Sequence, residues 1–428
     1  MHKILKNKTI YLAPFNDLSQ KLFHKLSETG IDIVGFVDSY RTGNGIVQPA
    51  EIKDYDYVVI SSPEYWTEIS LNFDNEKILL THSQLQPLIR YSEYMDYLDN
   101  CRKKYDILFL VYNKSNVQDA SIVIRELNLN GYSAAIIETN NQDRDNLRAG
   151  LLENKDIPVV IKEFVPYIDF KTLVCLIDWA DRKLIRDSQE KGIKTIGLVD
   201  GIEDFEDADY AYDRQAYKTV EYVLVSGRND MRHLEYKKDK CSIVGLPKMH
   251  NLWTSLVEYP TENLVAINLN FTYGSFEDMR EMWLGQVIEA CESLNINYII
   301  CQHHADRGEI PDIKKSREDV YTTIKKSSLV ISRFSTVISE ALALGKPVVY
   351  HNPHHEKVQL YKNPSGAFSI SDDVESLKSM ITYEISNNST VRERAKDFLD
   401  AQFNIREAEK PAVLAAKKII NITKEGKL

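Results

Sequence analysis

The chain has 428 residues, of which 43% are hydrophobic and 27% are charged, and its formal net charge is -10 at pH 7. This length predicts about two to three domains, and the composition argues against intrinsic disorder. The acidic balance argues against general binding of nucleic acid, which needs a basic surface, but a local cluster of donors can still hold a small anionic substrate.

Residues 1–90 are predicted to form a Rossmann-like unit. TIYLAPFNDLS reads as a strand, a turn and the start of a helix, and GIDIVGFVD reads as a second strand that ends at Asp38. The turn lacks the G-x-G-x-x-G glycines that allow a backbone to approach a pyrophosphate. We therefore expect no dinucleotide in this unit, and we expect Asp38 to end a strand or cap a helix.

Residues 91–255 form the second predicted unit, in which apolar strands alternate with helical stretches. Polar residues follow several of these strands: Asn113, Glu138, Asp178, Asp200 and Ser226. Ligands of open parallel sheets bind outside the carboxyl ends of the strands, so these positions are the first candidates for chemistry. The stretch LPKMHNLWTSLVEYPTEN, which follows the last of these strands, reads as a linker.

Residues 256–390 again alternate strands and helices, and residues 391–428 are expected to form a C-terminal helical segment. Two Rossmann-like domains joined by a linker describe the GT-B architecture, in which both domains face a substrate cleft. The predicted fold is therefore α/β of the GT-B type, with an additional N-terminal Rossmann-like unit. Lysines near the C-terminus, with the isoleucines among them, leave a peripheral position on a membrane as an alternative to ordinary packing.

The stretch SSLVISRFSTVISEALALGKPVVYHNPHHE reads as a strand, a turn with hydroxyl residues, a helix and a second strand. We expect the helix to run from Thr336 to Leu344 and to stop at Gly345, with Ser335 or Thr336 near its N-cap. The free N–H groups there suit a nucleotide phosphate, and Glu340 suits a ribose hydroxyl. The alternative is that Ser335 only caps the helix and that Glu340 is a surface carboxylate.

Three motifs resemble those of known glycosyltransferases. S-x-x-S-T-x-x-x-E-A-L-x-x-G-K-P-V-V resembles the nucleotide-binding segment of GT-B enzymes. QHHADRG resembles the His-Pro motif of bacterial sialyltransferases and capsule Kdo transferases; His303 matches its histidine, and His304 stands where the motif has proline. VDGIEDF resembles the acidic-Gly motif of the same enzymes, with Asp200 at the catalytic carboxylate. The overall likeness, to the retaining β-Kdo transferases, covers about residues 195–356.

This resemblance implies a CMP-β-Kdo donor, no metal or other cofactor, and a glycan or lipid-linked oligosaccharide acceptor. Residues 91–255 would be the acceptor and catalytic domain, and residues 256–390 the CMP-sugar-binding domain. Retention needs an enzyme carboxylate opposite CMP, which would be Asp200, whereas inversion would use Asp200 as a base. Glu138 is a second candidate carboxylate, for acceptor activation. Donor contacts are expected from these residues: His303, His304, Ser332, Ser335, Thr336, Glu340, His351 and Asn352.

Other functions stay open at this point. Within the enzymes they are a sialyltransferase and a transferase or epimerase that uses another nucleotide sugar; outside them is a non-catalytic glycan-binding module of a larger assembly protein. A metal site in YHNPHHE is less favoured than sugar or phosphate contact, because the adjacent His354 and His355 cannot easily share one ion.

The sequence also predicts a compartment. The five cysteines are scattered and show no CxxC spacing, which is typical of a reducing cytoplasm. We see neither a signal peptide nor a stretch of roughly 18 apolar residues. The expected location is the cytoplasm, with peripheral contact at the inner membrane as the furthest departure from it.

Overall fold

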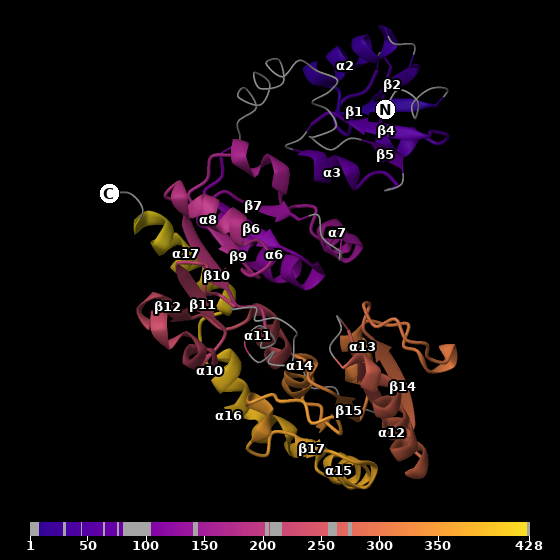
Figure 1. The fold of residues 1–428 in the computed structure, drawn as a ribbon, viewed down its shortest axis with the longest axis vertical. Helices are drawn as coiled ribbons and strands as arrows, with labels where there is room; N and C mark the ends of the chain where they lie inside the picture. The colour runs from indigo at the N-terminus through magenta and orange to yellow at the C-terminus, as the bar shows by residue number, and fades with distance from the viewer. Residues whose placement is uncertain are drawn as a thin grey trace. The chain divides into compact units, whose positions relative to one another are not determined.

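The computed structural model describes residues 8–28, 31–43, 45–62, 65–74, 77–79, 104–139, 144–201, 205, 216–255, 263–272 and 276–425. Two compact units divide the chain: residues 1–198 with residues 416–428, and residues 199–415. Parallel strands alternate with helices in both units (Figure 1), which confirms the predicted α/β class.

The first sheet belongs to the first unit and has the strand order β3-β2-β1-β4-β5. Its strands and the helices beside them are β1 (Ile10–Ala13), α2 (Asp17–Glu28), β2 (Ile33–Val37), β3 (Ile46–Val47), β4 (Tyr57–Ile60), α3 (Trp66–Ser70) and β5 (Ile78–Leu79). Asp38 follows β2, and its carboxylate accepts the backbone N–H groups of Phe15 at 3.1 Å and Tyr40 at 2.8 Å. The prediction that Asp38 ends a strand is confirmed, because β2 ends at Val37 and the bond from Tyr40 closes the turn that follows.

Five neighbouring strands of the second sheet also lie in the first unit, in the order β10-β9-β6-β7-β8. The elements are β6 (Ile107–Val111), α6 (Lys114–Leu129), β7 (Ala134–Glu138), α7 (Arg144–Glu153), β8 (Val159–Ile161), β9 (Thr172–Cys175), α8 (Arg182–Glu190) and β10 (Lys194–Leu198). Every residue of β6 and β9 is buried, which explains why their sequences are continuous apolar runs rather than alternating ones.

The second unit begins with two further strands and then builds the third sheet, whose order is β14-β13-β15-β16-β17. The strands are β11 (Tyr222–Val225), β12 (Cys241–Ile243), β13 (Leu264–Leu269), β14 (Asn297–Gln302), β15 (Leu329–Ser332), β16 (Val348–His351) and β17 (Ser369–Ser371). The helices are α10 (Arg228–Met231), α11 (Pro247–Thr254), α12 (Arg280–Ser293), α13 (Val320–Lys326), α14 (Val337–Ala343), α15 (Val374–Ser386), α16 (Val391–Phe403) and α17 (Pro411–Glu425), the last of which continues into the first unit.

Helices cover both faces of the third sheet, because alternate residues of each strand point to opposite sides. Val330 and Val348 pack with α14 and α16 in one apolar cluster. Ile331 and Val349, each the next residue along its strand, pack with α12 and α15 in the other. The polar ends of the strands therefore emerge from a sheet that is held on both sides.

The fold also bears on the predicted linker, on the cysteines and on a membrane span. Residues 247–254, which read as part of a linker, form the helix α11. The cysteines in the described part of the chain, Cys175, Cys241, Cys291 and Cys301, are all free. Burial raises the pKa of the Cys175 thiol well above its ordinary value, as expected for a core thiol. No described helix is both long and apolar enough to cross a membrane.

Candidate functional site

The carboxyl ends of β14, β13 and β15 meet at one edge of the third sheet, because the three strands are parallel neighbours. Polar contacts join the loops that follow them. The His303 N–H group donates to the Leu269 carbonyl at 2.8 Å, and Asn268 Nδ2 donates to Ser332 Oγ at 2.9 Å. Asn270 Nδ2 donates to the Phe334 carbonyl at 2.9 Å. The sheet thus brings two loops to the two sides of β13: residues 303–308 after β14, the histidine loop, and residues 333–336 after β15, the hydroxyl loop.

His303 is oriented by its own loop. Its Nδ1 accepts the N–H group of Ala305 at 3.2 Å, so the proton of the neutral imidazole is on Nε2, which then acts as the donor. The His304 ring lies 4.2 Å from the His303 ring, centroid to centroid, and the His304 residue is exposed. The two histidines that the sequence leaves unresolved therefore lie side by side at this edge.

A buried ion pair holds the histidine loop in place. The Asp306 carboxylate accepts from Arg280 Nε at 2.9 Å, from the Gly308 N–H group at 3.1 Å and from the Phe271 N–H group at 3.3 Å. A Cβ atom on Gly308 would lie 2.0 Å from Arg280 Cζ, so a larger residue would displace the guanidinium from its present position. Neither Arg280 nor Asp306 was predicted as a site residue, because the two lie in separate segments of the sequence.

The hydroxyl loop has the predicted helix start. Thr336 is the N-cap of α14, Ser335 Oγ accepts the Val337 N–H group at 3.2 Å, and Gly345 has the positive φ of 76° that ends such a helix. Ser332 is fully buried, and its Oγ donates to the Arg333 carbonyl at 2.6 Å. Ser332 and Ser335 therefore both shape the loop.

Arg333 and Glu356 anchor this loop from inside. Glu356 is buried and pairs with the Arg333 guanidinium; it also accepts the Phe334 N–H group at 3.3 Å and lies 3.4 Å from His354 Nε2. Burial raises the pKa of the Glu356 carboxyl, but the hydrogen bond from His354 and the charge of Arg333 outweigh it and hold the pKa below its ordinary value. Arg333 Cζ lies 4.9 Å from the centre of the Phe271 ring.

Glu340 is not a surface carboxylate. Only 3% of the residue is exposed, and its Oε1 pairs with Lys248 Nζ of α11 at 2.7 Å. Because α14 begins at Val337, Glu340 lies one turn into the helix, as the sequence predicts. The alternative that Glu340 lies on the surface is wrong.

His351 and Asn352 lie at the end of β16, where they stabilise the structure. His351 is fully buried; its Nδ1 contacts Ser371 Oγ and its Nε2 contacts Gln286 Oε1, each at 2.9 Å. Asn352 closes the following turn, since its Oδ1 accepts the Glu356 N–H group at 2.7 Å. These bonds assign both side chains a place in the framework beneath the loops.

The buried His351 should make the protein less stable to unfolding at mildly acidic pH. Burial lowers the pKa of its imidazole from 6.5 to about 4. Below the ordinary pKa the unfolded chain binds a proton that the folded chain does not, so stability falls as the pH falls. The unfolding free energy of the parent should fall between pH 7 and pH 5, and His351→Gln should make this fall smaller by about 2 kcal/mol.

Urea unfolding of parent and variant at both pH values measures this difference. Burial raises the pKa of the Asp230 carboxyl to about 7, which makes an opposite contribution, but it does so in both proteins and cancels. His355 is exposed, so His355→Gln is the control that should keep the parent's pH dependence. Equal pH dependence in parent and His351→Gln would contradict the assignment.

The two predicted carboxylates lie at the ends of strands in the second sheet. Asp200 is partly buried and follows β10 by two residues, and residues 202–204 of its motif lie outside the described residues. Glu138 ends β7 in the first unit; it is 5% exposed and accepts a hydrogen bond from the Thr67 hydroxyl of α3.

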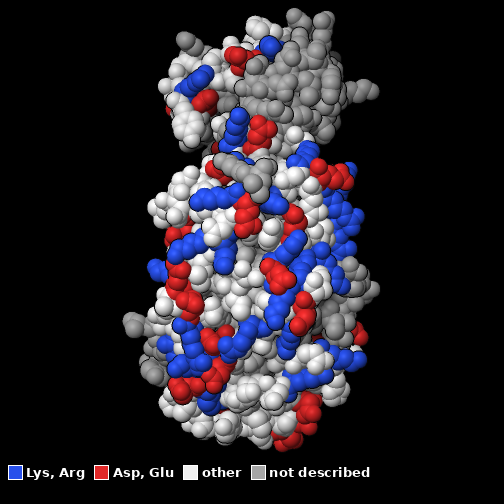
Figure 2. Space-filling model, turned by 90° about the vertical axis from the view of Figure 1, so that its left-hand side faces the viewer, with Lys and Arg blue, Asp and Glu red and all other residues white. Residues whose placement is uncertain are grey.

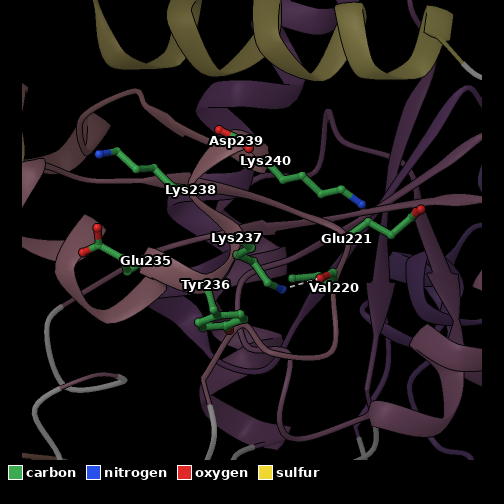
Figure 3. Close-up of a pocket in the computed structure, with 8 residues that line it drawn as sticks. All are labelled: Val220, Glu221, Glu235, Tyr236, Lys237, Lys238, Asp239 and Lys240. Atoms are coloured by element: carbon green, nitrogen blue, oxygen red, sulfur yellow. Dashed lines mark hydrogen bonds between the residues drawn. The ribbon is translucent and has the colours of Figure 1, made fainter.

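The second unit also contains a pocket of about 400 Å³, lined by Val220, Glu221 and residues 235–240 (Figure 3). Lys237 Nζ donates to the carbonyl oxygens of Tyr217 and Val220, each at 2.8 Å, so its charge is used in the wall. Lys238 and Lys240 extend in opposite directions in Figure 3, and the acidic residues of the lining offset the lysines. The pocket therefore lacks the convergent donors of an anion site.

Metal-ligating groups and the distribution of surface charge are two further features of the described residues. They contain no group of three or more His, Cys, Asp or Glu side chains placed to hold a metal ion. Figure 2 shows Lys and Arg side chains interspersed with Asp and Glu on the face that it displays, rather than one basic stripe.

No protein-family model matches the sequence, and no curated protein sequence matches it significantly. Solved structures do match. The UDP-GlcNAc 2-epimerase from Neisseria meningitidis, bound to UDP-GlcNAc, has a TM-score of 0.52 and 14% identity, over 75% of this chain and 100% of that chain. A putative UDP-N-acetylglucosamine 2-epimerase from Listeria monocytogenes has a TM-score of 0.53 and 12% identity, over 75% of this chain and 96% of that chain.

A variant of the wall teichoic acid polymerase TagF has a TM-score of 0.50 and 11% identity, over 81% of this chain and 99% of that chain. At these identities the likeness shows the fold alone. The chain has the GT-B fold that the sequence predicts, with an additional N-terminal Rossmann-like sheet.

Proposed function

We propose that this chain is a glycosyltransferase that moves a Kdo residue from CMP-β-Kdo to a glycan or lipid-linked oligosaccharide acceptor. The observation that carries the proposal is the edge of the third sheet, where the His303 loop and the hydroxyl loop lie on the two sides of β13. Outside the carboxyl ends of parallel strands, such loops are where α/β proteins bind nucleotides.

The donor contacts in this proposal follow from the chemistry of the side chains. His303 Nε2–H can donate to a phosphate oxygen and stabilise CMP as it leaves. The Ser335 hydroxyl, which accepts the Val337 N–H group, can add a donor to the phosphate, and Glu340 accepts from the ribose hydroxyls. His304 lies beside His303 and can contribute a second donor to the same phosphate.

Asp200 supplies the nucleophile. Its carboxylate oxygen bonds to the anomeric carbon as the bond from that carbon to the phosphate oxygen breaks, and CMP leaves with the electron pair. The acceptor hydroxyl then displaces Asp200 and gives up its proton, so two inversions yield retention. Glu138 is the candidate base for that proton, and the role requires its hydrogen bond from Thr67 to open.

The experiment is a donor panel. CMP-Kdo, CMP-sialic acid and UDP-GlcNAc are incubated separately with the protein and glycan acceptors, and the released nucleotide is quantified against heat-denatured protein. We expect CMP from CMP-Kdo, and NMR of the product should show the anomeric configuration of the donor. CMP release only from CMP-sialic acid, or an inverted product, would overturn the donor or the stereochemistry.

A second candidate is a sugar-nucleotide epimerase, because two of the matching structures are UDP-GlcNAc 2-epimerases. The contacts that we assign to phosphate and ribose do not distinguish the two reactions. Conversion of UDP-GlcNAc to its epimer in the absence of any acceptor would establish this candidate in place of the first.

A further inference from the structure

We infer that Lys248 positions Glu340 to select ribonucleotides over 2′-deoxyribonucleotides, an inference that rests on the proposed nucleotide site. Lys248 lies in α11, a segment whose sequence reads as a linker. Its Nζ lies 2.7 Å from Glu340 Oε1, with 19% of the Lys248 side chain and 4% of the Glu340 side chain exposed.

The place of Lys248 in its helix argues against a role in helix stability. It is the second residue of α11, directly after Pro247, and a cation in the first turn of a helix opposes the helix dipole. Glu340, by contrast, lies near the start of α14, where the dipole favours a carboxylate. The attraction between Lys248 and Glu340 therefore offsets the unfavourable interaction of Lys248 with the dipole of its own helix.

Packing fixes α11 against α14, so the pair is held in one geometry. Arg392 of α16 donates to the carbonyl oxygens of Trp253 in α11 and, at 3.3 Å, of Ala343 in α14. The Arg392 guanidinium carbon lies 4.4 Å from the centre of the Trp253 ring. A rigid support of this kind is what a side chain needs in order to present one acceptor in a set direction.

The pair controls what Glu340 can accept. Lys248 binds Oε1, which orients the carboxylate so that its other oxygen, Oε2, can accept from the ribose hydroxyls. Without the ammonium, the contact that orients the carboxylate is lost, and Oε2 no longer meets the ribose hydroxyls in a set direction. Selection for the ribose 2′-hydroxyl is then lost, while phosphate and base contacts are kept.

The test measures the affinities of CMP, 2′-deoxy-CMP, UMP and 2′-deoxy-UMP by calorimetry. We expect the parent to prefer the ribonucleotide by about tenfold, the effect of one hydrogen bond to a charged group. Lys248→Met should reduce this preference to under about twofold by weakening ribonucleotide binding, and Lys248→Arg should restore most of it. Glu340→Gln should give the same loss, and adding Lys248→Met to it should change nothing further.

Lys378→Met is the matched control, since Lys378 pairs with an exposed carboxylate in α15 of the same unit and should leave the preference unchanged. A parent that prefers ribonucleotides equally with and without the Lys248 ammonium overturns this inference and leaves the proposed function standing. A parent that binds neither CMP nor UMP overturns the proposed function itself. If Lys248→Met does not fold, the Glu340→Gln result decides, because an unchanged preference there contradicts the inference.

Discussion

Asp200→Asn is expected to reduce sugar transfer by about 10³-fold or more, while the affinity for CMP changes by less than about threefold. The amide keeps the size of the side chain, and it removes the negative charge that a nucleophile or a general base needs. The donor contacts that we assign belong to other side chains, so this replacement should leave them intact.

The measurement combines initial rates of CMP release with calorimetry of CMP binding. Asp187→Asn makes the same chemical change on an exposed position of α8 and should leave both quantities unchanged. Mass spectrometry after addition of donor should find a sugar-sized adduct on Asp200 of the parent and none on the variant. Full turnover by Asp200→Asn would remove Asp200 from the mechanism.

The fold was predictable because its signals are local. Ile107–Val111 is apolar at every position, as a parallel strand buried on both faces must be, and Gly345 ends its helix through a positive φ that glycine adopts easily. The position of Ser335 near an N-cap follows from the chemistry of a single hydroxyl next to a helix. None of these predictions needs a partner that is distant in the sequence.

The charged framework of the site was not predictable in this way, because its members are paired by the tertiary structure. Arg333, which follows β15, forms an ion pair with Glu356 in the segment after β16. Arg280, the first residue of α12, forms an ion pair with Asp306 in the segment after β14. Lys248 lies in a segment that reads as a linker, and only the folded chain shows its partner. Similarly, His351 ends a strand, as a site residue would. Its ring is buried, however, and its Nε2 contacts Gln286 of α12.

Glu356→Gln is expected to lower the unfolding free energy of the second unit by about 3–5 kcal/mol. Both members of the pair are buried, with 5% of the Arg333 side chain and 4% of the Glu356 side chain exposed. Removing one charge leaves the other without compensation in a medium that solvates it poorly, and this cost exceeds the lost attraction. Urea unfolding followed by intrinsic fluorescence measures the change.

Two comparisons separate the charge from the shape of the site. Glu375→Gln removes the acidic member of an exposed pair with Lys378 and should leave the unfolding midpoint where it is. The double variant Arg333→Met with Glu356→Leu removes both charges and should recover most of the stability, because a buried apolar pair needs no solvation. Its affinity for CMP should nevertheless stay low. In this variant the Phe334 N–H group has lost its acceptor, and the hydroxyl loop has lost the ion pair that anchors it. Tight CMP binding by the double variant would show that the loop keeps its shape without the ion pair, and Glu356 would then support the fold and not the site.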